Sequence, residues 1–205
     1  MFTGIVTGIG TITKAEERGD LRLTISAPLD PANIAIGASI ACSGVCLTVV
    51  ERGGSAGDAW FAVDVSAETV RCTMAQMWAE GASLNIEPSL RVGDEIGGHI
   101  VTGHVDAVGT VVSAGPEGDS TRIDIRAPAE MAPYIAGKGS ITVNGVSLTV
   151  NAVADEADGK CIFTLNIIPH TGEVTTLGML ESGSEVNLEI DVLARYLKRM
   201  QSLAN

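Results

Sequence analysis

Aromatic side chains are scarce in this chain. They make up 3% of its 205 residues, whereas hydrophobic residues make up 45% and charged residues 19%. A chain of this composition is globular rather than disordered, but its core must be built from Val, Ile, Leu and Ala. Because β-branched side chains pack well in strands, the composition favours β structure.

Positive charge is also in short supply. The chain has 13 Lys and Arg residues against 25 Asp and Glu residues, which gives a formal net charge of −12 without a compensating basic cluster. A surface of this sign repels phosphate backbones and anionic lipids. We therefore expect no nucleic-acid partner and no membrane partner.

A leader and a disulfide pattern are missing as well. The start, MFTGIVTGIG, lacks the basic residues and long apolar stretch of a signal peptide. The uncharged run 31–50 is interrupted by Gly, Ser, Thr and Asn, so a buried pair of strands explains it better than a membrane span. Cys42, Cys46, Cys72 and Cys161 lack paired spacing and suit a reducing compartment. These features predict a cytoplasmic protein with free thiols.

The chain does contain a repeated phrase. SGVCLTV occupies residues 43–49 and NGVSLTV occupies residues 144–150. Neighbouring segments correspond in the same order, FTGIVTGIG with VTGHVDAVG and FAVDVSAET with FTLNIIPHT. An accidental match would not align its neighbours, so the pattern indicates a duplicated domain of about 95 residues. We assign residues 1–97 to the first domain and residues 98–190 to the second.

Each repeat has the pattern of several short strands. DLRLTIS and TRIDIRA alternate polar and apolar residues, as half-buried strands do. The repeated phrase itself is typical of a strand, a Gly-containing turn and a second strand. About six strands per repeat favour a closed barrel, which leaves no exposed edge. The predicted fold class is all-β, with two tandem six-stranded Greek-key β-barrels.

Residues 191–205 depart from this pattern. Asp191 is suited to cap a helix, and apolar residues then recur at helical spacing, at Leu193, Leu197, Met200 and Ala204. A helix this short is marginal in water, so its apolar stripe must pack on another surface. It covers its own barrel or meets equivalent helices of other subunits. We expect the second arrangement and assign residues 191–205 to a C-terminal oligomerisation helix.

The repeated phrase places polar side chains on one face. Residues two apart in a strand point the same way, so Cys46 and Thr48 share a face, as do Ser147 and Thr149. Such a pair often only satisfies a turn, but its presence in both copies favours two related ligand sites. Because a thiol ionises more easily than a hydroxyl, Cys46 is a candidate nucleophile or proton acceptor, and Ser147 a hydrogen-bond donor or activated nucleophile. This pattern suits a reaction between two copies of one molecule.

The three histidines do not form a familiar metal site. No Cys or carboxylate stands at a zinc spacing around His99, His104 and His170, and the first repeat has Ile5 where the second has His104. We therefore expect no metal. We interpret His99 as a buried, hydrogen-bonded core histidine. His104, beside a Gly-rich strand start, is a candidate acid or base.

The chain combines MFTGIV, the two repeated phrases, DEIGGHIVTGHVD, and TTLG followed by VNLEID. Together these motifs span essentially the whole chain and resemble the riboflavin synthase family of the alpha-chain type. The resemblance implies two six-stranded barrels, a C-terminal helix, and a homotrimer whose active sites form between the first barrel of one subunit and the second barrel of its neighbour. It also implies a reaction without metal or external cofactor. Two molecules of 6,7-dimethyl-8-ribityllumazine dismutate by transfer of a four-carbon unit, giving riboflavin and 5-amino-6-(D-ribitylamino)uracil.

The resemblance also implies a set of site residues. The catalytic candidates are Phe2, Cys46, His104 and Ser147. The substrate-binding candidates are Ser39, Gly44, Thr48, Ser66, Thr69, Val105, Lys138, Gly145, Thr149, Ile168, Thr171 and Asp191. His170 stands where some family members have Glu, so no role is carried over to it.

The implied chemistry begins with a proton leaving the C7 methyl group of one lumazine. The electron-poor ring stabilises the resulting carbanion, so a modest base suffices, and Cys46, His104 and Ser147 are the candidates. The nucleophile at C7 of the acceptor is water, a hydroxyl or a thiol. Holding the rings face to face contributes up to about 7 to 11 kcal/mol.

Two other functions fit parts of the sequence. A non-catalytic lumazine or flavin carrier on the same duplicated barrel would bind the ligand unchanged, but the retained Cys46, His104 and Ser147 argue against it. A structural protein whose repeat only builds a trimer would not need the paired polar positions.

Overall fold

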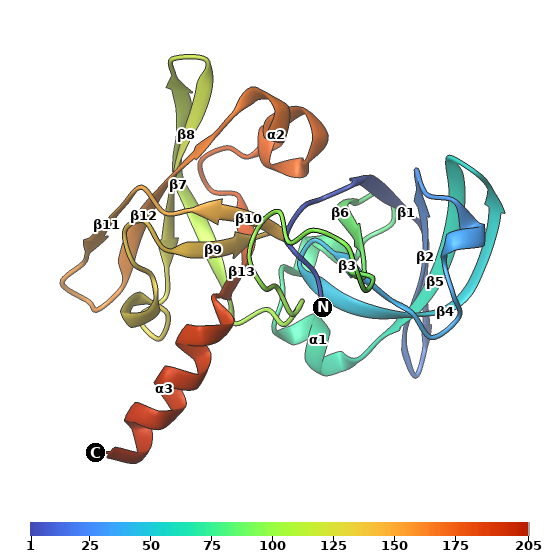
Figure 1. Cartoon of the computed structure of the whole chain (residues 1–205), viewed down its shortest axis with the longest axis horizontal. Helices are drawn as coiled ribbons and strands as arrows, with labels where there is room; N and C mark the ends of the chain where they lie inside the picture. The colour runs from blue at the N-terminus through green and yellow to red at the C-terminus, as the bar shows by residue number, and fades with distance from the viewer. Residues whose placement is uncertain (205) are drawn as a thin grey trace.

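The computed structural model describes residues 1–204. Asn205, the last residue of the predicted helical segment, and the side chain of Ala204 lie outside the described part of the chain. Two β domains lie side by side, with the N-terminus between them, and a helix extends from the second domain (Figure 1). The predicted all-β fold of two tandem repeats followed by a C-terminal helix is confirmed. The first repeat closes into the expected six-stranded barrel, whereas the second forms a seven-stranded sheet that is not closed.

The first repeat forms a closed six-stranded barrel. Its strands are β1 (Gly8–Arg18), β2 (Asp20–Ala27), β3 (Ser39–Cys42), β4 (Val45–Ser55), β5 (Asp58–Val65) and β6 (Ser83–Pro88). They are ordered β1-β2-β5-β4-β3-β6, and every neighbouring pair is antiparallel. Because β2 pairs with β5 rather than with β3, the connection is of the Greek-key type. The short helices are η1 (Pro31–Asn33), α1 (Ala67–Arg71) and η2 (Ala75–Trp78).

The second repeat forms a seven-stranded sheet in the order β10-β9-β13-β7-β8-β12-β11. Its strands are β7 (Ala107–Glu117), β8 (Ser120–Ala127), β9 (Ser140–Val143), β10 (Val146–Thr149), β11 (Ala152–Asp155), β12 (Cys161–Ile167) and β13 (Glu185–Ile190). Its helices are η3 (Ala132–Tyr134), α2 (Pro169–Val174), η4 (Thr176–Met179) and α3 (Val192–Ala204).

The seventh strand arises because the counterpart of β4 is divided into β10 and β11. At the division, the backbone N–H of Val150 donates to Gly139, on the β9 side, and that of Asn151 donates to Thr164 in β12. The chain therefore changes its pairing partner between these two residues. In β4 the same change occurs at a register shift between Val49 and Glu51, and the strand stays continuous.

Each repeat has its own aliphatic core around one buried phenylalanine. Phe61 packs with Ile12, Leu23, Ile25 and Leu84 in the first core. Phe163 occupies the corresponding place in the second core. A fully buried side chain of this size stabilises the fold by about 1.5 to 3 kcal/mol relative to an exposed one. The cores thus have the Val, Ile and Leu composition that the low aromatic content indicated.

The turns of the two repeated phrases meet back to back where the repeats join. Gly44 and Gly145 have φ angles of +82° and +81°, and a Cβ on Gly44 would lie 2.8 Å from the backbone nitrogen of Gly145. Only glycine permits both this conformation and this approach. The predicted role of the two glycines in substrate binding stays a prediction, because here their backbones contact each other.

Two buried asparagines join the repeats with matching hydrogen bonds. Asn85 of β6 donates its side-chain amide to the Asn144 carbonyl at 2.9 Å, and Asn187 of β13 donates to the Ser43 carbonyl at 2.9 Å. Their side-chain oxygens accept backbone N–H groups at 2.7 and 2.9 Å. The duplication therefore extends to the contact between the repeats.

Helix α3 projects from the end of β13 (Figure 1). Asp191 accepts a hydrogen bond from the backbone N–H of Leu193 at 2.9 Å, which confirms it as the helix cap. Leu193, Leu197 and Met200 are 71%, 56% and 67% exposed, so the apolar stripe does not cover its own barrel. Within residues 1–204, no helix combines the length and the apolar character that crossing a membrane requires.

Candidate active site

The first residues of each repeat lie against the barrel of the other repeat. The Gly4 carbonyl accepts a hydrogen bond from the backbone N–H of Ser147 at 2.9 Å, and the Gly103 carbonyl accepts one from Cys46 at 2.8 Å. Phe2 pairs antiparallel with Val101 between these two contacts. Cys46 and Ser147 are therefore each flanked by residues from the opposite repeat.

A buried glutamate holds each of these start segments. Glu87 of β6 accepts the backbone N–H groups of Thr3 and Gly4 at 2.7 and 3.0 Å. Glu189 of β13 accepts three consecutive backbone N–H groups, from residues 102–104, at 2.8 to 3.1 Å. Burial raises the pKa of both carboxyl groups, and the hydrogen bonds partly oppose that rise. The sequence signal for this pair was the match of LNIE with VNLE.

A cavity of about 380 Å³ lies beside Cys46. It is lined by Thr69 and Cys72 from α1 and its C-cap, and by His104 and Val105 from the start of the second repeat. The hydroxyl of Ser66 caps α1 and accepts the backbone N–H of Thr69 at 3.2 Å. The structure thus brings four of the expected residues, Cys46, Thr69, His104 and Val105, around one cavity.

Two further first-repeat candidates, Ser39 and Thr48, lie on the same outer face of the barrel as Cys46. Ser39 pairs directly with Thr48 across β3 and β4, and Ala41 pairs with Cys46. Since residues that pair directly share a face, Ser39, Cys46 and Thr48 all point away from the core. Ser39 also lines a neighbouring cavity of about 530 Å³.

Phe2 is buried against this face. It is 1% exposed and packs with Ala41, Val101 and Cys46. A phenyl ring carries no titratable group, so its contact with Cys46 supports the position of the thiol. Its assignment as a catalytic residue stays a prediction.

Ser147 is paired with His99 in the second repeat. The Ser147 hydroxyl lies 2.7 Å from Nδ1 of His99, and the Thr142 hydroxyl lies 3.2 Å from Nε2. Burial lowers the pKa of His99, which favours the neutral imidazole, while the charge of Asp191 acts in the opposite direction. With its proton on Nε2, His99 donates to Thr142 and accepts from Ser147, which is the arrangement of a base beside a hydroxyl nucleophile.

The interpretation of His99 as a buried, hydrogen-bonded core histidine is confirmed for its hydrogen bonds but not for a place in the core. The side chain is half-buried and its two ring nitrogens contact polar residues of β9 and β10. His99 and Ser147 are 48 residues apart, so no local pattern connects them. By contrast, His104 is exposed at the Cys46 cavity, as its expected role requires.

The other second-repeat candidates occupy the places in the second repeat that the duplication predicts. Thr149 pairs with Ser140 as Ser147 pairs with Thr142. Ile168 and Thr171 lie at the start of α2, where Ser66 and Thr69 lie in the first repeat. Lys138 precedes β9 with a φ of +69°, a region that side chains rarely adopt. The roles of these residues in binding stay predictions.

The residues around Cys46 and the residues around Ser147 lie apart in one chain. We call each group a half-site. Among residues 1–204, the cavity beside Cys46 is lined by none of the second-repeat candidates Lys138, Ser147, Thr149 and Thr171. No group of three or more His, Cys, Asp and Glu side chains in this part of the chain is arranged to hold a metal ion. The chain therefore offers one thiol half-site and one hydroxyl–imidazole half-site.

Comparison with known proteins places both halves in one family. The model of the lumazine binding domain matches residues 3–89 and again residues 102–191. The chain is 47% identical to riboflavin synthase of Brucella abortus (strain 2308) over 98% of both chains. It is 43% identical to riboflavin synthase of Mycobacterium tuberculosis (strain ATCC 25618 / H37Rv) over the whole length of both. The solved structure of LumP complexed with 6,7-dimethyl-8-(1'-D-ribityl) lumazine is 28% identical, with a TM-score of 0.78 over 93% of this chain and 99% of that one.

Proposed function

This chain belongs to the riboflavin synthase family, and we propose that its two half-sites each hold one molecule of 6,7-dimethyl-8-ribityllumazine so that one gives a four-carbon unit to the other. The products are riboflavin and 5-amino-6-(D-ribitylamino)uracil. One observation carries this proposal. Two copies of the same strand–turn–strand unit present Cys46 in one half-site and the Ser147–His99 pair in the other. Identical substrates would thus meet different reactive groups.

The second half-site is suited to proton removal. Neutral His99 accepts a proton through Ser147 from the C7 methyl group of the lumazine bound on the second barrel. Because the resulting carbanion is delocalised into the electron-poor ring, an imidazole is a strong enough base. This step gives the donor molecule its nucleophilic carbon.

The first half-site is suited to hold the acceptor. Cys46 and His104 line one cavity, so a thiol or a water molecule adds at C7 of this lumazine while His104 exchanges the proton. Thr48 and Thr69 offer hydroxyl groups to the ribityl chain. Bringing the two rings together by binding removes much of the entropic barrier to their reaction.

The assembly that we propose is a homotrimer in which the first barrel of one subunit faces the second barrel of its neighbour. The exposed apolar stripe of α3 supports association, since an isolated helix does not keep such a stripe in water. The free thiols of Cys42, Cys46, Cys72 and Cys161 suit the cytoplasmic location that we propose. The domain boundaries at residues 1–97, 98–190 and 191–205 form part of the same proposal.

The proposal is tested by turnover. Purified protein is incubated with the lumazine, and both products are quantified by chromatography with fluorescence detection. We expect one riboflavin and one pyrimidine for every two lumazines consumed, without added metal or cofactor. Consumption without riboflavin would refute the reaction.

A non-catalytic carrier is the second candidate, because LumP has been solved in complex with a lumazine on a similar fold. The same incubation separates the two functions. A carrier binds the lumazine and returns it unchanged, whereas the synthase converts it. A structural protein of this fold would not bind the lumazine at all.

A further inference from the structure

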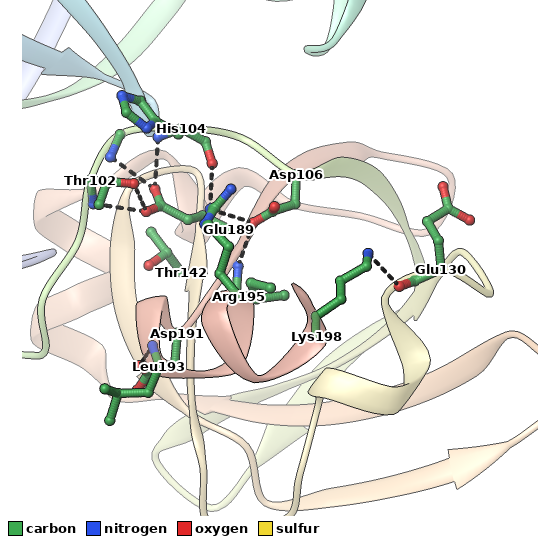
Figure 2. Close-up of polar contacts among 12 residues, drawn as sticks. Thr102, His104, Asp106, Glu130, Thr142, Glu189, Asp191, Leu193, Arg195 and Lys198 are labelled. Carbon is green, nitrogen blue, oxygen red and sulfur yellow. Dashed lines mark hydrogen bonds and ion pairs between the residues drawn. The ribbon is translucent and has the colours of Figure 1, made fainter. Parts of the chain in front are cut away.

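The C-terminal helix reaches back to the segment that carries His104 (Figure 2). Arg195 of α3 donates to the carboxylate of Asp106 at 2.9 Å and to the backbone carbonyl of His104 at 3.3 Å. On the basis of the proposed function, we propose that Arg195 is a positioning residue that fixes His104 at the Cys46 half-site.

The segment around His104 is held on several sides. The backbone N–H of His104 donates to Glu189 at 3.1 Å, and the Asp106 carboxylate accepts the backbone N–H of Ile190 at 2.9 Å. Arg195 adds the contact to the carbonyl of His104 itself (Figure 2). Both peptide groups that flank the His104 side chain are therefore bound by side chains from β13 and α3.

The ion pair between Arg195 and Asp106 is partly shielded from solvent. The Arg195 side chain is 35% exposed and that of Asp106 is 19% exposed. Asp106 also accepts a backbone N–H, which fixes its carboxylate in place. Such a pair keeps its geometry better than one between two freely moving surface side chains.

The first repeat shows that the fold does not depend on this ion pair. Its start segment is held by Glu87 just as the second is held by Glu189. However, Ile5 stands in place of His104, and Thr7 stands in place of Asp106 and donates to Ile86. The contact from Arg195 therefore occurs in the second repeat, whose start segment carries His104.

The position of His104 matters because its neighbours in the chain contact the half-site directly. Gly103 accepts the backbone N–H of Cys46, and Val105 lines the same cavity as Cys46 and Thr69. A displacement of about 1 Å at a reacting group can lower a rate by about 100-fold. We expect a smaller effect from loss of Arg195, because Glu189 still holds the N–H side of His104.

The test compares two arginines on the same helix. Arg195→Met removes the charge and keeps a long, helix-favouring side chain, and Arg199→Met is the matched control, since Arg199 contacts Ser202 on its own helix. Arg195→Lys retains one charged donor. Asp106→Asn breaks the ion pair from the other partner without altering α3, so that the question can still be answered if the helix variant assembles poorly.

Steady-state kinetics and sedimentation are measured for each variant. We expect Arg195→Met and Asp106→Asn each to lower kcat by about 3- to 30-fold, with KM within about twofold and the same sedimenting species as the parent. We expect Arg195→Lys to recover much of the loss. The double variant should be no slower than the slower single variant, because both changes break the same ion pair.

Two results would overturn the inference. One is a kcat for Arg195→Met equal to that of Arg199→Met, and the other is independent, multiplying effects of the Arg195 and Asp106 changes. Either result would leave the proposed function intact, because the parent protein would still make riboflavin. Failure of the parent to make riboflavin would instead refute the proposed function.

Discussion

The hydroxyl of Ser147 lies 2.7 Å from Nδ1 of His99, which joins β10 to the segment that precedes β7. At the matching place in the first repeat, Cys46 lines a cavity with His104. The duplicated fold therefore repeats one backbone frame and varies the side chain at the matching position.

Removal of the Ser147 hydroxyl tests the second half-site. We expect Ser147→Ala to lower kcat by about 10²- to 10⁴-fold, because the proton path to His99 is broken, with KM changed by less than about threefold. Ser182→Ala, which alters an exposed hydroxyl at the surface, is the control. Rapid-quench kinetics on both variants gives the comparison, and a Ser147→Ala enzyme with parental kcat would exclude Ser147 from the chemistry.

The pH profile tests the state of His99. Because burial lowers its pKa from the ordinary value, the neutral base persists at and below the usual histidine range. We expect kcat to stay level from about pH 8 to about pH 6.5 and to fall only below that, as His99 takes up a proton. A profile of kcat against pH on the parent enzyme measures this. A loss of kcat that already begins above neutral pH would contradict the assignment.

The buried asparagine contact tests how the repeats are joined. We expect Asn187→Ala to lower the free energy of unfolding by about 2 to 4 kcal/mol, because it leaves the Ser43 carbonyl and the Met74 N–H without their partner. Asn33→Ala, at an exposed site, should change it by less than about 0.5 kcal/mol. Urea denaturation measures both. Equal effects of the two changes would show that the asparagine contacts do not stabilise the junction.

Deletion of the tail tests the role of α3 in assembly. Removal of the residues after Asp191 takes away the exposed stripe of Leu193, Leu197 and Met200. We expect the truncated protein to sediment as a smaller species than the full chain, because the apolar contact between subunits is lost. Sedimentation velocity over a range of concentrations makes the measurement. An unchanged trimer would show that the barrels alone hold the subunits together.

The repeat, its strands and the capped helix could be predicted because each rests on short-range patterns. The phrase shared by residues 43–49 and 144–150 identified the duplication, and alternation identified the strands. The division between β10 and β11 could not be predicted, since it depends on where the strand changes partner.

The half-sites were predicted less completely for a physical reason. Cys46 and Thr69 lie in matching motifs, and so could be found. The contacts that assemble each half-site, such as Gly103 with Cys46 and His99 with Ser147, join residues far apart in the chain. The repeated Asn and Glu in LNIE and VNLE were a usable signal, because polar residues alternating with apolar ones in two buried strands require partners.

The central claim is that a working site combines the thiol half-site of one subunit with the hydroxyl–imidazole half-site of another. It is tested most directly by mixing two defective variants. Cys46→Ala/His104→Ala removes the reactive groups of the first half-site, and His99→Ala/Ser147→Ala removes those of the second. Each variant alone should be nearly inactive.

The two variants are unfolded together, refolded and assayed for riboflavin. If sites form between subunits, random assembly restores about a quarter of the parental activity, since that fraction of interfaces joins two intact half-sites. Activity that stays at the level of the separate variants, in mixed assemblies verified by mass spectrometry, would contradict the account.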